Sequence, residues 1–194
     1  TAVGMHALKA TTSGAYNTAM GRRALEANTT GDQNTAIGGL ALDANTTADN
    51  NTAIGYNSLS ANQTGTRNTA VGSQSLDSCT SSDNTAVGCE ALTTVTTGNS
   101  NTGVGAKALE DCTGSDNTAV GHRALRANTS ASGNVAVGRM SMDVNTSGAQ
   151  NVAIGAYALQ DNTTASYNTA VGYQALNDNT TRTQNTAARG LALD

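Results

Sequence analysis

The side chains with the greatest chemical potential in this sequence are three cysteines, Cys79, Cys89 and Cys112, and two histidines, His6 and His122. A metal site or a cysteine nucleophile needs such residues at short spacings, or a cysteine with a histidine base nearby. No Cys-x-x-Cys pair occurs, the histidines are remote from each other, and no pair of carboxylates is placed by a repeated spacing. We therefore predict that the chain is not an enzyme and uses neither a cofactor nor a metal.

Composition narrows the possible partners of the 194 residues. Charged residues make up 12% of the chain, the formal net charge is -4, and no basic stripe is visible. Surfaces that bind nucleic acids are basic because they neutralise phosphates, so no nucleic-acid partner is expected. No stretch approaches the run of about 18 apolar residues that a membrane-spanning helix needs, so no membrane insertion is expected.

A tandem repeat determines the structural elements that position these residues. One copy, at 168–184, reads Asn-Thr-Ala-Val-Gly-Tyr-Gln-Ala-Leu-Asn-Asp-Asn-Thr-Thr-Arg-Thr-Gln. The opening asparagine recurs every 17 residues, except for two steps of 16 residues, at Asn17, Asn34, Asn51, Asn68, Asn84, Asn101, Asn117, Asn134, Asn151, Asn168 and Asn185. A fixed period of this size is typical of a solenoid, in which each copy covers the hydrophobic face of its neighbour.

The repeat predicts an all-β fold. Glycine in every copy, with many threonines and asparagines, argues against helices. We predict a parallel β-solenoid or β-roll of about 12 turns, a single repeat domain over 1–194 and roughly 55 to 60 Å long. Each copy is expected to hold two short strands, and we expect the chain to be a fragment of a longer fibre because neither end carries a cap.

Glycine and the small and aliphatic residues occupy fixed positions when the opening asparagine is counted as position 0. Gly21, Gly38 and Gly55 stand at +4, where a strand must turn through a backbone conformation that favours glycine. Alanine at +2 is followed by valine or isoleucine at +3, and alanine at +7 by leucine at +8. Adjacent strand residues point to opposite faces, so both faces are apolar. Either the larger residues are covered from outside, or they fill the interior and the alanine columns lie against another surface, and both arrangements imply a partner. We expect the interface at Ile37, Leu42, Ile54, Leu59, Val71 and Leu76.

Asparagines are expected to form structural ladders inside the coil. The opening asparagines Asn17, Asn34, Asn51 and Asn68 form one column, and Asn28, Asn45 and Asn62 form another at +11. The +11 column changes to Cys79, Val95 and Cys112 in mid-chain, an exchange that indicates an inward-facing position. Cys79 and Cys112 lie two turns apart, about 9 to 10 Å, which is beyond disulfide reach. The N-glycosylation patterns at the +11 asparagines are then a by-product of the repeat.

The segment Asn-Thr-Ala-Val/Ile-Gly-x-x-Ala-Leu followed by Asn-Thr-Thr-Gly resembles the repeats of bacterial and phage fibre proteins that end in an intramolecular-chaperone domain. It is also similar to the shorter head repeats of trimeric autotransporter adhesins. The resemblance covers almost the whole chain. It implies a homotrimer that is extracellular, on the cell surface or on a virion, and that attaches to a surface such as a cell-surface glycan or another receptor.

Two ligand hypotheses remain beside this structural one. Exposed aromatic side chains can stack on sugar rings, and the candidates for ligand contact are Tyr56, Tyr157, Tyr167 and Tyr173. The threonine columns at +1 and +12 alternatively suggest an ice-binding solenoid, although Val135 and Val152 interrupt the +1 column. A self-assembling extracellular filament is a third possibility. The pattern alone does not distinguish a trimer from a dimer.

Overall fold

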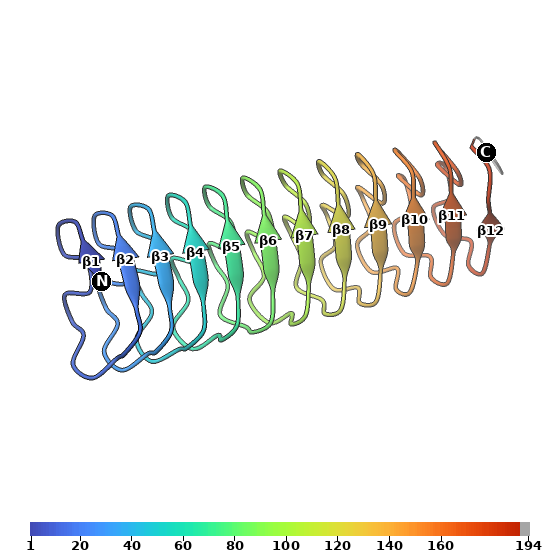
Figure 1. The fold of residues 1–194 in the computed structure, drawn as a ribbon. Coiled ribbons are helices and arrows are strands. Elements are labelled where there is room, and N and C mark those ends of the chain that lie inside the picture. The colour runs from blue at the N-terminus through green and yellow to red at the C-terminus, as the bar shows by residue number, and fades with distance from the viewer. Residues whose placement is uncertain (191–194) are drawn as a thin grey trace.

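The computed structural model describes residues 1–190, which wind into one straight coil (Figure 1). Its regular secondary structure is a set of short strands, β1 (Ala2–Val3), β2 (Thr18–Met20), β3 (Thr35–Ile37), β4 (Thr52–Ile54), β5 (Thr69–Val71), β6 (Thr85–Val87), β7 (Thr102–Val104), β8 (Thr118–Val120), β9 (Val135–Val137), β10 (Val152–Ile154), β11 (Thr169–Val171) and β12 (Thr186–Ala187). They form one twelve-stranded sheet in chain order.

Equivalent positions of successive copies stack directly on one another. In the parallel pairing of β2 with β3, Thr18 lies beside Thr35 and Ala19 beside Ala36. The same register holds across a 16-residue copy, where Thr69 pairs with Thr85, so the missing residue is absorbed outside the strand. The predicted all-β parallel solenoid with a repeat of about 17 residues is confirmed, with one turn of the coil between successive strands. At about 4.8 Å for each of these turns, the rod is roughly 50 Å long.

The glycine at +4 follows each of the strands β1–β11, where the backbone conformation and the close stacking favour glycine; in the last copy Arg189 stands at this position. Gly21, Gly38 and Gly55 have φ angles of 138°, 138° and 140°, which side chains of L-residues rarely adopt. A Cβ on Gly55 would also lie 2.6 Å from the carbonyl carbon of Gly72 in the next turn. Conformation and stacking distance therefore both require glycine, as the sequence predicted for the corner.

The second strand predicted in each copy is absent from residues 1–190. The residues around +8 form turns instead, and Leu25, Leu42 and Leu59 have φ angles of 51°, 50° and 52°. A left-handed conformation costs an ordinary residue roughly 1 to 2 kcal/mol, whereas full burial of a leucine contributes roughly 1.5 to 3 kcal/mol. Because the tight turn points the leucine into the coil, burial offsets the strain.

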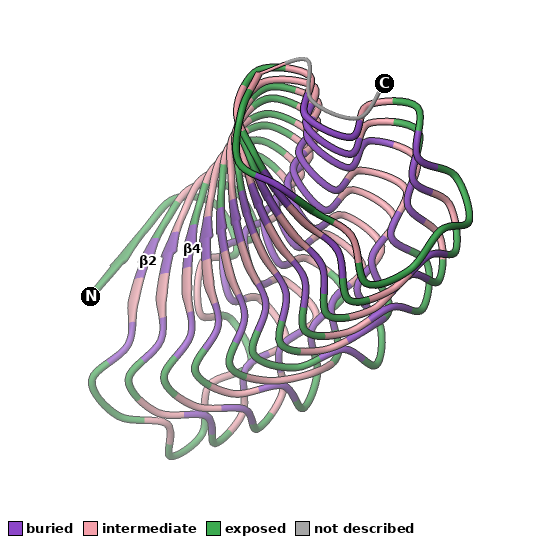
Figure 2. Ribbon diagram, turned by 90° about the vertical axis from the view of Figure 1, so that its right-hand side faces the viewer, coloured by how far each residue is buried: buried purple, intermediate pink, exposed green. Residues whose placement is uncertain are grey.

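Small side chains, leucines and asparagines fill the interior of the coil. Ala19, Ala36 and Ala53 at +2 are completely buried, as are the +7 alanines from Ala24 to Ala175 and the +8 leucines from Leu25 to Leu159; Ala7 and Leu8 in the first turn are partly buried. Figure 2 shows these buried segments recurring at the same place in every turn. Alanine suits the strand position because a coil with three-residue strands leaves little room between its walls.

The structure corrects part of the predicted interface. Leu42, Leu59 and Leu76 are 0% exposed within a single chain, so they cannot contact a partner. The expectation that they lie between chains is wrong, because the left-handed turn directs them inward. The +3 residues Ile37, Ile54 and Val71 behave differently, since their strand places them opposite the buried alanine, on the outside of the coil.

Candidate interaction surfaces

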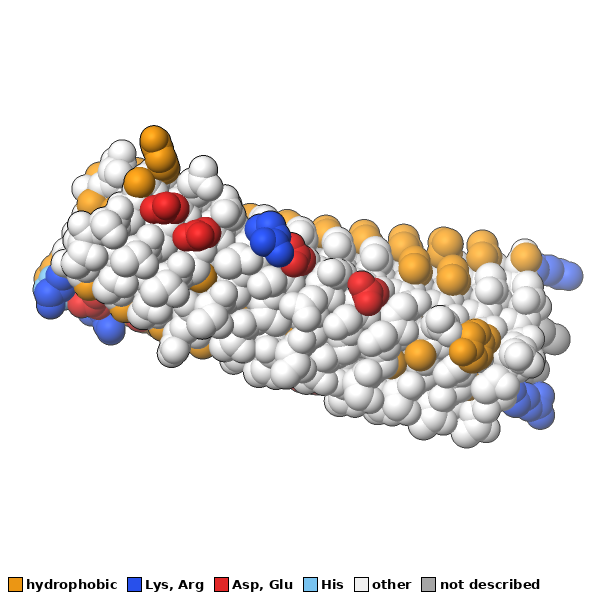
Figure 3. Space-filling model, turned by 90° about the horizontal axis from the view of Figure 1, so that it is seen from below, with side chains coloured by type: hydrophobic (Ala, Val, Ile, Leu, Met, Phe, Trp, Pro, Cys, Tyr) orange, Lys and Arg blue, Asp and Glu red, His pale blue; other side chains and the backbone are white. Residues whose placement is uncertain are grey.

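The outward side chains of β2–β11 make a continuous surface, which we call the strand face. It consists of two columns, threonine or valine at +1 and valine, isoleucine or methionine at +3. The +3 side chains are half-buried on the isolated chain: Ile54 is 37% exposed, Val87 38% and Ile154 41%. In Figure 3 a row of hydrophobic side chains runs along the upper edge of the rod, and charged side chains are sparse on the face in view. The strand face is thus a straight, uncharged and partly apolar stripe.

The two threonine columns differ in what their hydroxyl groups do. At +12, the Thr29 hydroxyl donates to the Thr46 carbonyl at 3.0 Å, and the Thr146 hydroxyl donates to the Thr163 carbonyl at 3.0 Å. The +1 threonines of the strand face, such as Thr35 and Thr52, use their hydroxyls in no hydrogen bond within residues 1–190. The +1 threonines therefore leave their hydroxyls unpaired, whereas most +12 hydroxyls are paired; within residues 1–190, Thr46 and Thr96 are among the exceptions at +12.

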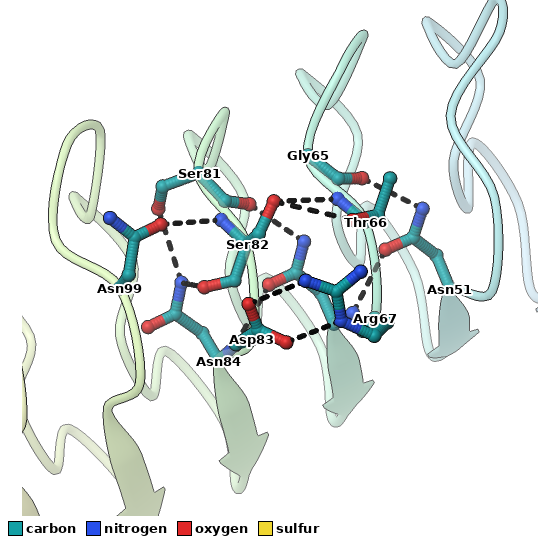
Figure 4. A network of polar contacts seen from close by, with 10 residues as sticks. Asn51, Gly65, Thr66, Arg67, Ser81, Ser82, Asp83, Asn84 and Asn99 are labelled. Atoms are coloured by element: carbon teal, nitrogen blue, oxygen red, sulfur yellow. Dashed lines mark hydrogen bonds and ion pairs between the residues drawn. The ribbon is translucent and has the colours of Figure 1, made fainter.

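The opening asparagines form a continuous ladder of hydrogen bonds inside the coil. The backbone N–H of Asn34 donates to Asn17 Oδ1 at 2.9 Å, and that of Asn51 donates to Asn34 Oδ1 at 3.0 Å. Most of the side-chain amides also reach the loop of their own turn or of the next one; Asn51 Nδ2, for example, donates to the Gly65 carbonyl at 2.9 Å (Figure 4). The same arrangement continues at Asn68, whose backbone N–H donates to Asn51 Oδ1.

The +11 asparagines form a second buried ladder. Asn45 Nδ2 donates to Asn28 Oδ1 at 2.9 Å, and Asn62 Nδ2 donates to Asn45 Oδ1 at 3.1 Å. All three are 0% exposed, so a glycan on any of their glycosylation patterns would have no space. These asparagines are structural because they satisfy the buried backbone of the loops.

Cysteine replaces asparagine in this column together with a shorter loop. Asn62 Nδ2 donates to the carbonyl three residues later, at Gly65, whereas the Cys79 thiol donates to the carbonyl two residues later, at Ser81, over 3.5 Å. The shorter side chain therefore accompanies a loop that has lost one residue. Burial raises the pKa of the Cys79 thiol, and it also raises the pKa of the Cys112 thiol. Both thiols are free and buried, and Cys89 is free and exposed.

Two of the four predicted ligand-contact tyrosines lie together. The rings of Tyr157 and Tyr173 meet edge to face, with centroids 6.0 Å apart and planes at 87°. The guanidinium of Arg139 lies 5.5 Å from the Tyr157 ring centroid, within range of a cation–π interaction. Tyr56 occupies the same +5 column as Tyr173 near the other end of the rod, and Tyr167 lies in the loop before the strand. The structure does not bring these two to the tyrosine pair.

A charged pocket lies on turns before those of the tyrosine pair, and it was not expected from the sequence. The pocket measures about 370 Å³ and is lined by Lys107, Glu110, His122, Arg123 and Arg126. The sequence does contain a signal for this pocket, in the variable columns at +5, +6 and +9. When the copies are aligned at the 16- or 17-residue step, the pocket residues stand in these columns on consecutive turns.

A buried aspartate from the turn after the pocket orients its two arginines. The Asp143 side chain is 3% exposed and accepts from Arg123 Nη2 at 2.8 Å and from Arg126 Nε at 2.9 Å. Two arginines thus share one carboxylate. Lys107 is held between Glu90 at 2.8 Å and Glu110 at 2.9 Å, and these carboxylates raise its pKa.

Comparisons with protein-family models, with curated proteins and with solved structures give no match to this chain. No cluster of metal-ligating side chains occurs in the part of the chain that the structure describes. Among the same residues, no helix is long and apolar enough to cross a membrane.

Proposed function

We propose that this chain is a rigid structural segment of a fibre that acts outside the cell, on the cell surface or on a virion, and that its copies associate as a homotrimer through the strand face. The half-exposed aliphatic column along β2–β11 is the observation that carries the proposal. The stripe runs the length of a straight rod, and a second copy of the chain has the same spacing between its turns. The strand faces of two copies can therefore stay in contact along their whole length.

The dimensions of the strand face support association along its whole length. Residues two apart on a strand lie ~7 Å from each other, so each side-chain column is about 7 Å wide. Two such columns along a rod of roughly 50 Å, with strands repeating every ~4.8 Å, cover on the order of 600 Å². A stable interface takes about 800 Å² from each partner, so the strand face supplies most of one and its bordering residues supply the rest. Three copies with their strand faces toward a common axis would withdraw the aliphatic column from water.

The interior supports a role as a rigid spacer. Backbone and asparagine hydrogen bonds connect every turn to the next; Thr18 N–H donates to the Asn34 carbonyl at 2.9 Å, and Thr35 N–H to the Asn51 carbonyl at 2.8 Å. The core closes within one chain, so the surface residues are free to vary without loss of the fold. Such a rod can hold a binding surface at a distance from its anchor.

The proposal is tested by the molar mass in solution, measured by light scattering during size exclusion. We expect three times the subunit mass of 19.4 kDa for the unaltered chain. Ile54→Asp places a charge on the strand face and should shift the mass to that of a monomer, because equivalent carboxylates would meet at the interface. Gln63→Asp is the matched control, since Gln63 is exposed and lies outside the strand face. A monomeric unaltered chain, or a trimer that persists in Ile54→Asp, contradicts the proposal.

Ice binding is a second candidate, and the unpaired hydroxyls of the +1 threonines favour it. Together with the +3 column they form a flat array with a constant step, which is the geometry that ordered water requires. The same strand face is covered in a trimer, so the two functions exclude each other. Ice binding predicts that the chain is a monomer that causes thermal hysteresis and shapes faceted ice crystals. Thr52→Lys should abolish both effects and Thr29→Lys should retain them. A monomer that shows neither effect rejects ice binding.

A further inference from the structure

The corner that follows the strand carries a basic and aromatic surface on consecutive turns of the C-terminal half. We call it the cationic strip and define it as Arg123, Arg126, Arg139, Tyr157 and Tyr173. Arg139 follows β9, Tyr157 follows β10 and Tyr173 follows β11, so each contributes from its own turn. With the pocket at Arg123, after β8, the strip spans four turns, or about 15 Å between its first and last turns.

Arg139 is the residue of the strip with donors available to a ligand. Its guanidinium lies on the Tyr157 ring, and no carboxylate within residues 1–190 pairs with it, whereas Arg123 and Arg126 are both bound to Asp143. A guanidinium stacked on an aromatic ring keeps its N–H groups at its edge, where two of them fit the two oxygens of a carboxylate. Arg139 is exposed, so a ligand can reach these groups.

The tyrosine pair supplies the second feature of a binding site. Tyr173 is 55% exposed, and its position is fixed by edge-to-face contact with Tyr157. A fixed aromatic ring one turn beyond the contact of Arg139 with Tyr157 suits an extended ligand that presents an apolar ring face and, further along, a carboxylate. The pocket at Arg123 and Arg126 continues the strip, and the guanidinium N–H groups that Asp143 does not use can donate to sugar hydroxyls.

We propose that the cationic strip binds carboxylated oligosaccharides, with one sugar ring on Tyr173 and the carboxylate of a neighbouring sugar on Arg139. Sugar rings present C–H groups to an aromatic face, and a chain of acidic sugars would extend along the strip toward the pocket. A nucleic acid fits less well, because the chain has a net charge of -4 and Glu110 and Asp143 lie within this surface. The inference adds a ligand-binding surface to the fibre proposed above and rests on that proposal for its biological setting.

Two probes distinguish the sources of carboxylated sugar. Tetragalacturonate represents uronic-acid polymers, with its neutral methyl ester as control, and sialyllactose represents sialylated glycans, with lactose as control. Titration calorimetry with the full chain should show binding of at least one acidic probe, weakened by salt, and at least tenfold weaker binding of its neutral counterpart. Binding of neither acidic probe, or equal binding of acidic and neutral forms, overturns the proposal.

The repeat provides matched controls for the variants. Arg139→Gln should weaken binding about tenfold, because a charge-assisted pair is lost, and Tyr173→Ala should weaken it by a similar factor. Arg22→Gln and Tyr56→Ala alter exposed residues in the same +5 column at the other end of the rod and should leave the affinity within about twofold. Equal losses in the controls reject the strip as the site.

The outcome is separable from that of the fibre proposal. If the chain is a monomer that binds acidic sugars through Arg139, the binding-site proposal is supported and the trimer proposal is contradicted. If the chain is a trimer that binds neither acidic probe, the fibre proposal is supported and the binding-site proposal is contradicted.

Discussion

Removal of one buried asparagine should destabilise the coil far more than removal of an exposed one that makes the same kind of bond. Asn34 is 0% exposed; its Oδ1 accepts from the Asn51 backbone N–H at 3.0 Å, and its Nδ2 donates to the Ala48 carbonyl at 2.8 Å. Asn34→Ala leaves the Asn51 N–H buried without an acceptor, whereas the Ala48 carbonyl keeps a second donor, Asn45 Nδ2 at 3.1 Å. One orphaned group costs about 1 to 3 kcal/mol, so the free energy of unfolding should fall by about 1 to 3 kcal/mol.

Asn99→Ala is the matched control for this change. The Asn99 side chain also accepts a backbone N–H from the neighbouring turn, that of Ser82 at 3.0 Å, but it does so at an exposed position (Figure 4). Water can replace the lost acceptor there, so the change should cost no more than about 0.5 kcal/mol.

Urea unfolding followed by circular dichroism, at one protein concentration for all variants, measures both changes. Amide hydrogen exchange adds a local measurement, because the Asn51 N–H should lose protection in Asn34→Ala. A loss below about 1 kcal/mol for Asn34→Ala, or equal losses in the two variants, would show that the ladder contributes little and would refute this reasoning.

Three further predictions concern the glycine corner, the interior and the cysteines. Gly55→Ala should cost about 3 kcal/mol in the same urea assay, because it adds backbone strain to a close contact with Gly72, and a cost below about 1 kcal/mol contradicts the stacking argument. Leu59→Asp should abolish cooperative unfolding because it buries an unpaired charge, whereas Ile54→Asp should leave the circular dichroism spectrum unchanged; equal damage by both would mean that the two positions have been misplaced. A thiol reagent should label Cys89 at once and Cys79 and Cys112 only on unfolding. Burial raises the pKa of both buried thiols above that in the unfolded chain. Their contribution to stability should therefore be complete below the ordinary thiol pKa of about 8.5 and be lost as the pH rises through the folded-state values. In a pH series, Cys79→Val should show a smaller loss of stability than the unaltered chain.

The repeat made the register, the glycine corner and the asparagine ladders predictable from sequence. Each of these features is set by a physical constraint that acts at the same repeat position in successive turns. The constraint is therefore visible in the sequence as a column of one residue type. Asn45, for example, stands 17 residues after Asn28 because the two side chains bond to each other. A single copy would not have revealed this, since a lone asparagine before two threonines suits a turn or a helix N-cap equally well.

The position of the leucines was not predictable in the same way. An alanine–leucine pair suggests a strand, and a left-handed leucine is unfavourable by itself. Only the closed coil supplies the burial that makes the conformation of Leu42 and Leu59 favourable, so the decision belongs to tertiary packing and not to local preference. Tyr157 and Tyr173 were predicted as ligand contacts, but their grouping with Arg139 was not, because contacts between side chains on successive turns depend on packing that a column of residue types does not give.

The inward turn of the leucines also decides how stability and recognition are divided in this molecule. If the leucines had faced outward, the fold would have depended on a partner to cover them. Because alanine, leucine and asparagine close the core within one chain, the strand face retains only a half-exposed aliphatic column and the corners retain none of the core residues. Substitutions on the strand face should therefore change association without unfolding the coil, and substitutions on the cationic strip should change ligand binding without changing association. This independence of the two surfaces allows the fibre proposal and the carboxylated-sugar proposal to be tested one residue at a time.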